Sequence, residues 1–251
     1  MHILLLAAAL AAEPELSVQV VYDNTSATEG IGADWGFAAL VRHRGRTVLF
    51  DSGTKPDLFL ANLRKLNIDP ASITHAVISH EHADHRNGIY ALYKLNPNIE
   101  VSFLSNFNAA AFEQADAVGM KPRRVSGPAE IVPGIYTTGI IDGSPPEQAL
   151  LIETAKGMVI LTGCSHPGVV PMVEAAGKQR GRKEVRFLLG GFHLLRDSDE
   201  QVREKIAGLK RLGVSSVAAT HCTGDRAIAL FREAWGKEFT AAGAGRRFTF
   251  D

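Results

Sequence analysis

Residues 80–85 read HEHADH, which places three imidazoles and two carboxylates within six positions, directly after an apolar run. Side chains two positions apart in extended backbone project to the same side, so His80 and His82 can bind one ion together. A turn of the chain at Ala83 would direct Asp84 and His85 toward a second ion. Imidazole and carboxylate ligands are typical of zinc, with iron and manganese as alternatives. The pattern predicts a metal centre, and we expect it to hold two zinc ions.

Two ions need further ligands from elsewhere, because four side chains on one turn cannot enclose both. Three histidines also follow apolar runs: His166 in TGCSHPG, His193 in GGFHL and His221 in THCTG. Taken alone, each of them could equally have a structural role, as a histidine that makes hydrogen bonds in the core or in a turn. Because all three lie at the same kind of strand end as the first cluster, we expect them to join one site.

Apolar runs of strand length alternate with stretches of helical spacing along the chain. The predicted strands are Leu16–Tyr22, Gly36–Arg42, Thr47–Phe50, Ile73–Ser79, two within Leu150–Thr162, Val185–Leu189 and Val214–Ala219. The predicted helices are Pro56–Leu66, Asp199–Leu212 and Ala227–Trp235. Strands dominate the first part and alternate with helices later. This order predicts one α/β domain with two sheets and outer helices, and with the site along one edge of the sheets.

The composition argues against some classes of protein and of binding partner. The chain has 251 residues, of which 45% are hydrophobic, and its 27 Lys and Arg balance 27 Asp and Glu. A chain of this length buries a core without a disulfide framework, and its mixed composition argues against disorder. Because a nucleic-acid protein should carry a basic face, the balanced charge argues against nucleic acid as the partner. We expect a small-molecule substrate.

The first twelve residues read as a leader rather than as part of the domain. Residues 3–12 are ILLLAAALAA, which has the length of a signal-peptide core and is too short to span a bilayer. No Lys or Arg precedes this run, so a first strand or a buried helical turn is the alternative. We expect residues 1–12 to be removed, a single domain over residues 13–251, and a periplasmic or secreted protein. Retention of the leader would indicate a cytoplasmic protein. No later stretch is long and apolar enough for a membrane span.

The two cysteines, Cys164 and Cys222, each lie close to a candidate ligand. Each could be a metal ligand or a small core residue, and in an oxidising compartment the two could form a disulfide. If the backbone is extended at Cys222, its side chain points away from that of His221, which favours the core for Cys222.

The HEHADH motif, together with LFDSG at Leu49–Gly53, resembles the metallo-β-lactamase superfamily. The segments TGCSHPG, GGFHL and THCTG are similar to its dihydropterin-synthase-like branch, which includes enzymes acting on a ribosyl aminobenzene phosphate. The resemblance covers residues 16 to 251. It implies a four-layer αββα sandwich with metals at the open edge of two facing sheets.

The resemblance also implies a role for each candidate residue. The first metal would be held by His80, His82 and His166, and the second by Asp84, His85 and His221. Asp51 would orient one of these ligands from behind. His193 would line the cavity and contact an anionic group of the substrate, with metal ligation as a lesser alternative. Asn24 would lie near the substrate pocket.

The chain departs from the family pattern at three places. Many binuclear members have a bridging aspartate in a Thr-Gly-Asp segment, where this chain has Cys164. Either Cys164 supplies a thiolate, or no protein side chain bridges the ions. Arg86 adds a cation beside the motif, and Asp34-Trp35 replaces the Glu-His common in the branch, which could reshape the pocket.

The expected activity is metal-dependent hydrolysis of an ester, lactone or phosphoester, with a metal-bound hydroxide as nucleophile and Asp84 as the catalytic residue that orients it. Group transfer at the same metals is one alternative. Redox or oxygen chemistry at a di-iron centre is another alternative. The similar motif of flavodiiron proteins has a glutamate at the position of His82, which argues against a di-iron centre here.

Overall fold

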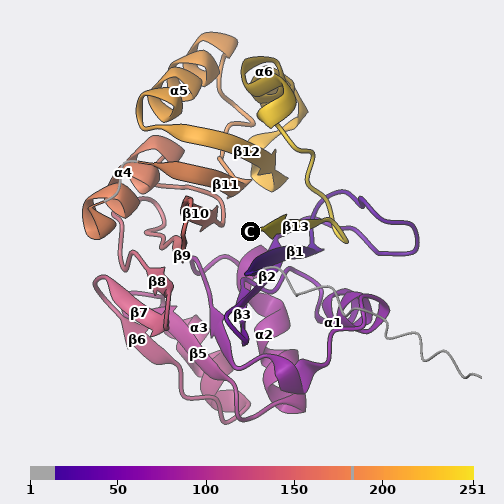
Figure 1. The fold of residues 1–251 in the computed structure, drawn as a ribbon. Helices are drawn as coiled ribbons and strands as arrows, with labels where there is room; N and C mark the ends of the chain where they lie inside the picture. The colour runs from indigo at the N-terminus through magenta and orange to yellow at the C-terminus, as the bar shows by residue number, and fades with distance from the viewer. Residues whose placement is uncertain (1–14, 182–183) are drawn as a thin grey trace, which may run out of the picture.

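Two β-sheets lie face to face, with helices on their outer faces (Figure 1), in the computed structural model, which describes residues 15–181 and 184–251. The predicted leader lies outside the described residues and stays a prediction. One sheet contains β1 (Leu16–Tyr22), β2 (Ala38–His43), β3 (Arg46–Phe50), β4 (His75–Val77), β5 (Glu100–Leu104), β6 (Arg123–Val125) and β13 (Arg247–Phe250). The other contains β7 (Ala129–Val132), β8 (Ile135–Thr137), β9 (Leu150–Thr154), β10 (Gly157–Thr162), β11 (Val185–Gly191) and β12 (Val214–Thr220).

The strand order is β13-β1-β2-β3-β4-β5-β6 in the first sheet and β12-β11-β10-β9-β8-β7 in the second. The helices are α1 (Pro56–Lys65), α2 (Ala83–Leu95), α3 (Ala109–Ala117), α4 (Val169–Arg180), α5 (Asp199–Arg211) and α6 (Asp225–Trp235), with 3₁₀ turns η1 (Pro70–Ser72), η2 (His221–Thr223) and η3 (Gly236–Glu238). None of the helices in the described ranges is long and apolar enough to cross a membrane.

Three apolar cores hold four layers together. Val48 and Phe50 of β3 pack in the core between the sheets, while Leu49 joins the core under α1 to α3. In β10, Leu161 faces the first sheet and Ile160 faces α4 to α6. Both faces of such strands are buried, which explains why they read as continuous apolar runs. The four-layer αββα sandwich is confirmed.

Every predicted strand and helix is present, with ends shifted by no more than two residues. The helices α2, α3 and α4 and the strands β5 to β8 and β13 were not predicted. The strands among them are three to five residues long, too short for a clear periodic pattern.

The helix α2 begins inside the HEHADH motif. His82 is its N-cap residue, in extended conformation with φ −66° and ψ 145°. The side chains of His80 and His82 therefore belong to the segment after β4, while Asp84 and His85 lie in the first helical turn. The carboxylate of Asp84 suits this position, because helix N-termini carry partial positive charge.

Candidate metal centre

The six predicted ligands meet at one edge of the two facing sheets, in two groups. The ligand atoms of His80, His82 and His166 all lie within 4.8 Å of one another, and we call these residues the first group. The second group consists of Asp84, His85, His221 and Cys164, whose ligand atoms also lie within 4.8 Å of one another. Cys164 thus joins the predicted ligands.

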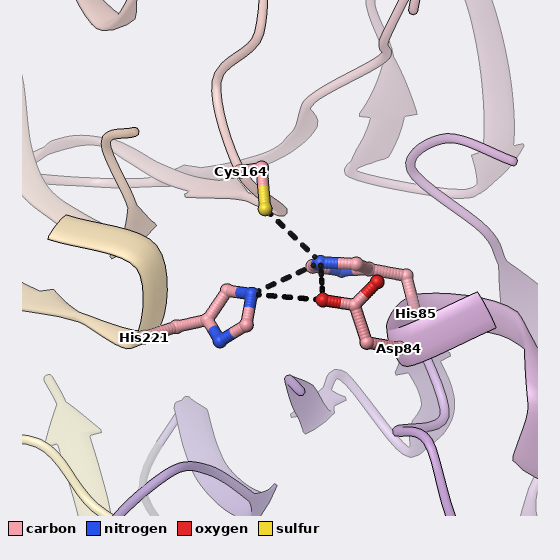
Figure 2. A group of neighbouring side chains, drawn as sticks. All are labelled: Asp84, His85, Cys164 and His221. Carbon is pink, nitrogen blue, oxygen red and sulfur yellow. Dashed lines mark hydrogen bonds and ion pairs between the residues drawn. The ribbon is translucent and has the colours of Figure 1, made fainter. Parts of the chain in front are cut away.

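The second group has the spacing of a single coordination sphere (Figure 2). His85 Nε2 lies 3.2 Å from both Cys164 Sγ and His221 Nε2. Asp84 Oδ2 lies 3.4 Å from His221 Nε2 and 3.7 Å from His85 Nε2. Tetrahedral zinc, with bonds of about 2.0–2.3 Å, places its ligand atoms roughly 3.3–3.7 Å apart. The four side chains therefore fit one zinc-sized ion, to which Cys164 could supply a thiolate.

Hydrogen bonds at Nδ1 orient two imidazoles of the second group. His85 Nδ1 donates to Asp51 Oδ2 at 2.7 Å, and Asp51 also accepts from the backbone N–H and hydroxyl of Ser79. His221 Nδ1 donates to Asn24 Oδ1 at 2.9 Å. These bonds leave Nε2 of each ring facing the ion position. Asn24, which the sequence analysis placed near the substrate pocket, contacts His221.

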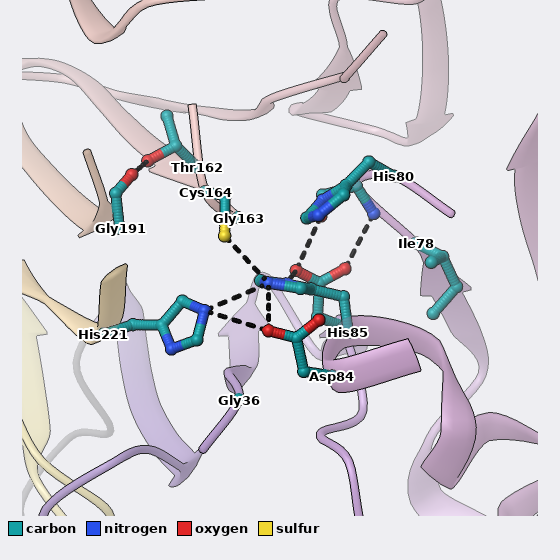
Figure 3. Close-up of polar contacts among 12 residues, drawn as sticks. Gly36, Ile78, His80, Asp84, His85, Thr162, Gly163, Cys164, Gly191 and His221 are labelled. Carbon is teal, nitrogen blue, oxygen red and sulfur yellow. Dashed lines mark hydrogen bonds and ion pairs between the residues drawn. The ribbon is translucent and has the colours of Figure 1, made fainter. Parts of the chain in front are cut away.

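The first group contains two buried nitrogens without a hydrogen-bond partner in the described part of the chain, His80 Nε2 and His166 Nε2. Leaving such an atom unpaired costs about 1–3 kcal/mol, so a bound cation would stabilise both. His80 Nδ1 lies 2.9 Å from Ser79 Oγ, which holds the ring in place. Figure 3 shows His80 on the far side of His85 from His221, so the two groups lie next to each other around His85.

Burial sets the protonation of these rings. Burial, together with the neighbouring imidazoles, lowers the pKa of His80 well below its usual value and that of His166 to about 3. Both rings are therefore neutral at pH 7 and have a free lone pair. For His85, burial opposes protonation, but the charge and hydrogen bond of Asp51 outweigh it and raise the pKa to about 9. An ion bound at His85 Nε2 would displace that proton.

The model of the metallo-beta-lactamase superfamily matches residues 32–180, more than half of the chain. The chain belongs to the metallo-beta-lactamase superfamily. It is 31% identical over 249 residues to 7,8-dihydropterin-6-methyl-4-(beta-D-ribofuranosyl)-aminobenzene-5'-phosphate synthase of Methanocaldococcus jannaschii, covering 82% of this chain and 85% of that protein. This similarity confirms the predicted branch.

Two solved structures share the superfamily fold. A metal-dependent hydrolase of the beta-lactamase superfamily matches with a TM-score of 0.78 and 25% identity, covering 94% of this chain and 99% of the other. The short form of human tRNase Z matches with a TM-score of 0.64 and 15% identity, covering 93% and 98%. The second likeness concerns the fold alone.

Glu147 is a site residue that the sequence analysis missed. Its buried carboxylate accepts backbone N–H groups from Gly163, Cys164 and Ser165 on Oε1, at 2.9, 2.9 and 3.0 Å. Oε2 accepts the N–H of His166 at 2.9 Å. Burial raises the pKa of Glu147 to about 7, against the effect of the hydrogen bonds. One carboxylate thus holds the loop that supplies Cys164 to the second group and His166 to the first. In the sequence, Glu147 is recognisable only as an acidic residue shortly before the apolar strand β9.

The remaining predicted positions line the site or turn away from it. Trp35 is 45% exposed, with its ring centroid 4.8 Å from that of His221. His193 is exposed, with its ring centroid 4.4 Å from that of His166. The guanidinium of Arg86 donates to the Glu81 carbonyl and the Tyr90 hydroxyl, so it anchors the motif to its own helix.

Cys164 and Cys222 are free thiols. Cys222 is buried, as the core interpretation expects. Its backbone is not extended, however, because His221–Thr223 forms the 3₁₀ turn η2. This turn places Cys222 Sγ within 4.8 Å of the ligand atoms of Cys164 and His193.

Asn24→Ala is expected to weaken metal binding at the second group about 10- to 100-fold, because His221 loses the hydrogen bond that fixes its ring. Titration of the metal-free protein with Zn²⁺ measures this change. Asn96→Ala is the control, since the Asn96 amide also makes hydrogen bonds within the protein but donates to the Pro70 and Ile73 carbonyls away from the site. Equal affinities in the two variants would contradict the assigned role of Asn24.

Proposed function

We propose that the protein is a metal-dependent hydrolase acting on an ester, lactone or phosphoester substrate. One observation carries this proposal: the first group has three protein ligands, and the second has four. A zinc site with three protein ligands keeps a position open for water or substrate, whereas four protein ligands close a site. The open position beside a second cation suits the activation of water.

Divalent ions held there would lower the pKa of water and polarise a carbonyl or phosphoryl oxygen. The protein's own contribution is orientation and charge. Burial disfavours ionisation of Asp84, but the hydrogen bond from His221 and the charge of His85 outweigh it and lower the pKa of Asp84. Asp84 is therefore ionised at neutral pH, and its side chain is 17% exposed toward the site. It can accept a hydrogen bond from the attacking water and direct a lone pair at the substrate.

The superfamily hydrolase that shares this fold supports the proposal. Group transfer is a second candidate, because the Methanocaldococcus jannaschii relative is a synthase. The two differ in which molecule attacks at the open position of the first group. Exposed Trp35 lies against His221, so it could contact a small-molecule substrate in either case.

The test combines metal analysis with a substrate screen. Protein loaded with zinc, manganese or iron is assayed on phosphodiester, phosphomonoester, lactone and β-lactam substrates in isotopically labelled water. Hydrolysis incorporates the label into product, and a chelator abolishes it. Turnover that leaves the label in the solvent and joins two substrates would identify a transferase.

We also propose export of the chain, supported by the apolar run in residues 3–12. We expect native protein to begin near Ala12 or Glu13 and to occur outside the cytoplasm. Mass spectrometry of the isolated protein measures its first residue. Intact chain with Met1, found in the cytoplasmic fraction, would refute export.

A further inference from the structure

A cluster of sulfur and imidazole ligands lies beside the second group and shares Cys164 with it. The ligand atoms of Cys164, His193 and Cys222 all lie within 4.8 Å of one another. The cysteines are 3% and 1% exposed, whereas His193 is exposed and gives access from solvent. We propose that these three residues bind a third metal ion, of the thiophilic class that includes Zn²⁺, Cd²⁺ and Cu⁺.

The fold builds this cluster at the ends of three adjacent strands. β11 lies between β10 and β12, and Cys164, His193 and Cys222 follow these strands in turn. The two cysteines meet across the end of β11 because Gly191 has no side chain. A Cβ atom at Gly191 would lie 2.6 Å from Cys222 Sγ, which is closer than atoms can approach.

Gly191 is held in this position by residues 162–165 at the end of β10. Its carbonyl accepts the Thr162 hydroxyl at 3.1 Å (Figure 3) and the Ser165 hydroxyl at 2.7 Å. Its N–H donates to the Gly163 carbonyl at 2.9 Å. The gap that Cys222 Sγ enters is therefore a fixed feature of the strand ends.

His193 adopts a backbone conformation that L-residues avoid. Its φ is +54°, in the left-handed region, which is strained for a residue with a side chain. Such strain persists where the surrounding structure imposes it, often at binding sites. Here it accompanies a ring nitrogen within 4.8 Å of both sulfur atoms.

Two sulfurs and one imidazole form a softer ligand set than either predicted group. Soft thiolates select zinc and Cu⁺ over the hard cations that prefer oxygen. As the metal–sulfur bonds form, the thiol protons pass to solvent. Cys164 also belongs to the second group, so its thiolate bridges the second and third ions. His193 is then a metal ligand, the lesser alternative of the sequence analysis, rather than a contact for substrate.

The test is a Cd²⁺ titration of the reduced, metal-free full chain. Bound metal is counted by elemental analysis, and thiolate–Cd²⁺ charge transfer is followed by ultraviolet absorbance. The wild type is expected to bind three ions per chain, and Cys222→Ser and His193→Ala two each. Loss of Cys222 also removes part of the charge-transfer absorbance. His75→Ala is the control and keeps three ions, because His75 contacts Thr74 and Glu100 away from the site.

Unchanged metal counts in Cys222→Ser and His193→Ala would overturn the third site. Cys222→Ala repeats the test without a buried hydroxyl if the serine variant does not fold. The first group contains no sulfur, so His166→Ala loses an ion with the charge-transfer absorbance intact. A failure of the first group is therefore distinguishable from a failure of the third site.

Discussion

Protein in which alanine replaces His166 is expected to retain the ion of the second group and to lose that of the first. Hydrolysis should then fall more than about 100-fold, because changes at residues that merely support a ligand already cost about 10- to 100-fold. His166 is a sensitive choice, since its buried Nε2 has no other partner among the described residues. Metal analysis and turnover on the best substrate of the screen measure both effects.

The control for this variant is His43→Ala. His43 is 1% exposed, and its Nδ1 contacts the Glu15 carbonyl away from the site. It should keep its full metal content and its turnover. If His166→Ala keeps the same metal content as the wild type, His166 is not a ligand, and the first group is assigned wrongly.

The candidate metal ligands could be predicted because they occur in short sequence motifs. His80 and His82 are two positions apart on extended backbone, which is enough to pair them. His166, His193 and His221 became candidates because they follow apolar strands, whose ends meet at one sheet edge. The family resemblance then selected His166 and His221 as ligands. These predictions depend on residue type and on spacing along the chain, and a sequence shows both directly.

Residues that act through long-range contacts carried no such signal. Asn24 reaches His221 across 197 positions, and Glu147 binds backbone groups, which every residue has. The start of α2 inside the HEHADH motif was also missed, because the helix is fixed by packing of Ile89 and Leu92 under the first sheet. The neighbours of buried Cys222 were missed for a related reason: the direction of its side chain depends on η2, a turn without periodicity.

The largest expected effect on stability is that of Glu147→Ala. The variant leaves four backbone N–H groups of residues 163–166 without their acceptor, in a part of the protein where water is excluded. Each unpaired N–H costs about 1–3 kcal/mol. The free energy of unfolding should therefore fall by several kcal/mol, a large share of the roughly 5–15 kcal/mol of a typical domain. Urea denaturation of the metal-free protein measures the change.

Glu147→Gln separates hydrogen bonding from cavity formation. An amide oxygen at the Oε1 position still accepts from Gly163, Cys164 and Ser165, but the amide NH₂ then faces the N–H of His166 and cannot accept it. The expected order of stability is wild type, then Gln, then Ala. Glu233→Ala is the control, because the Glu233 ion pair with Arg203 is mostly exposed and contributes at most about 1 kcal/mol. If Glu147→Ala is no less stable than this control, the carboxylate does not hold the loop. Cys164 and His166 would then have to be positioned by their own side-chain packing.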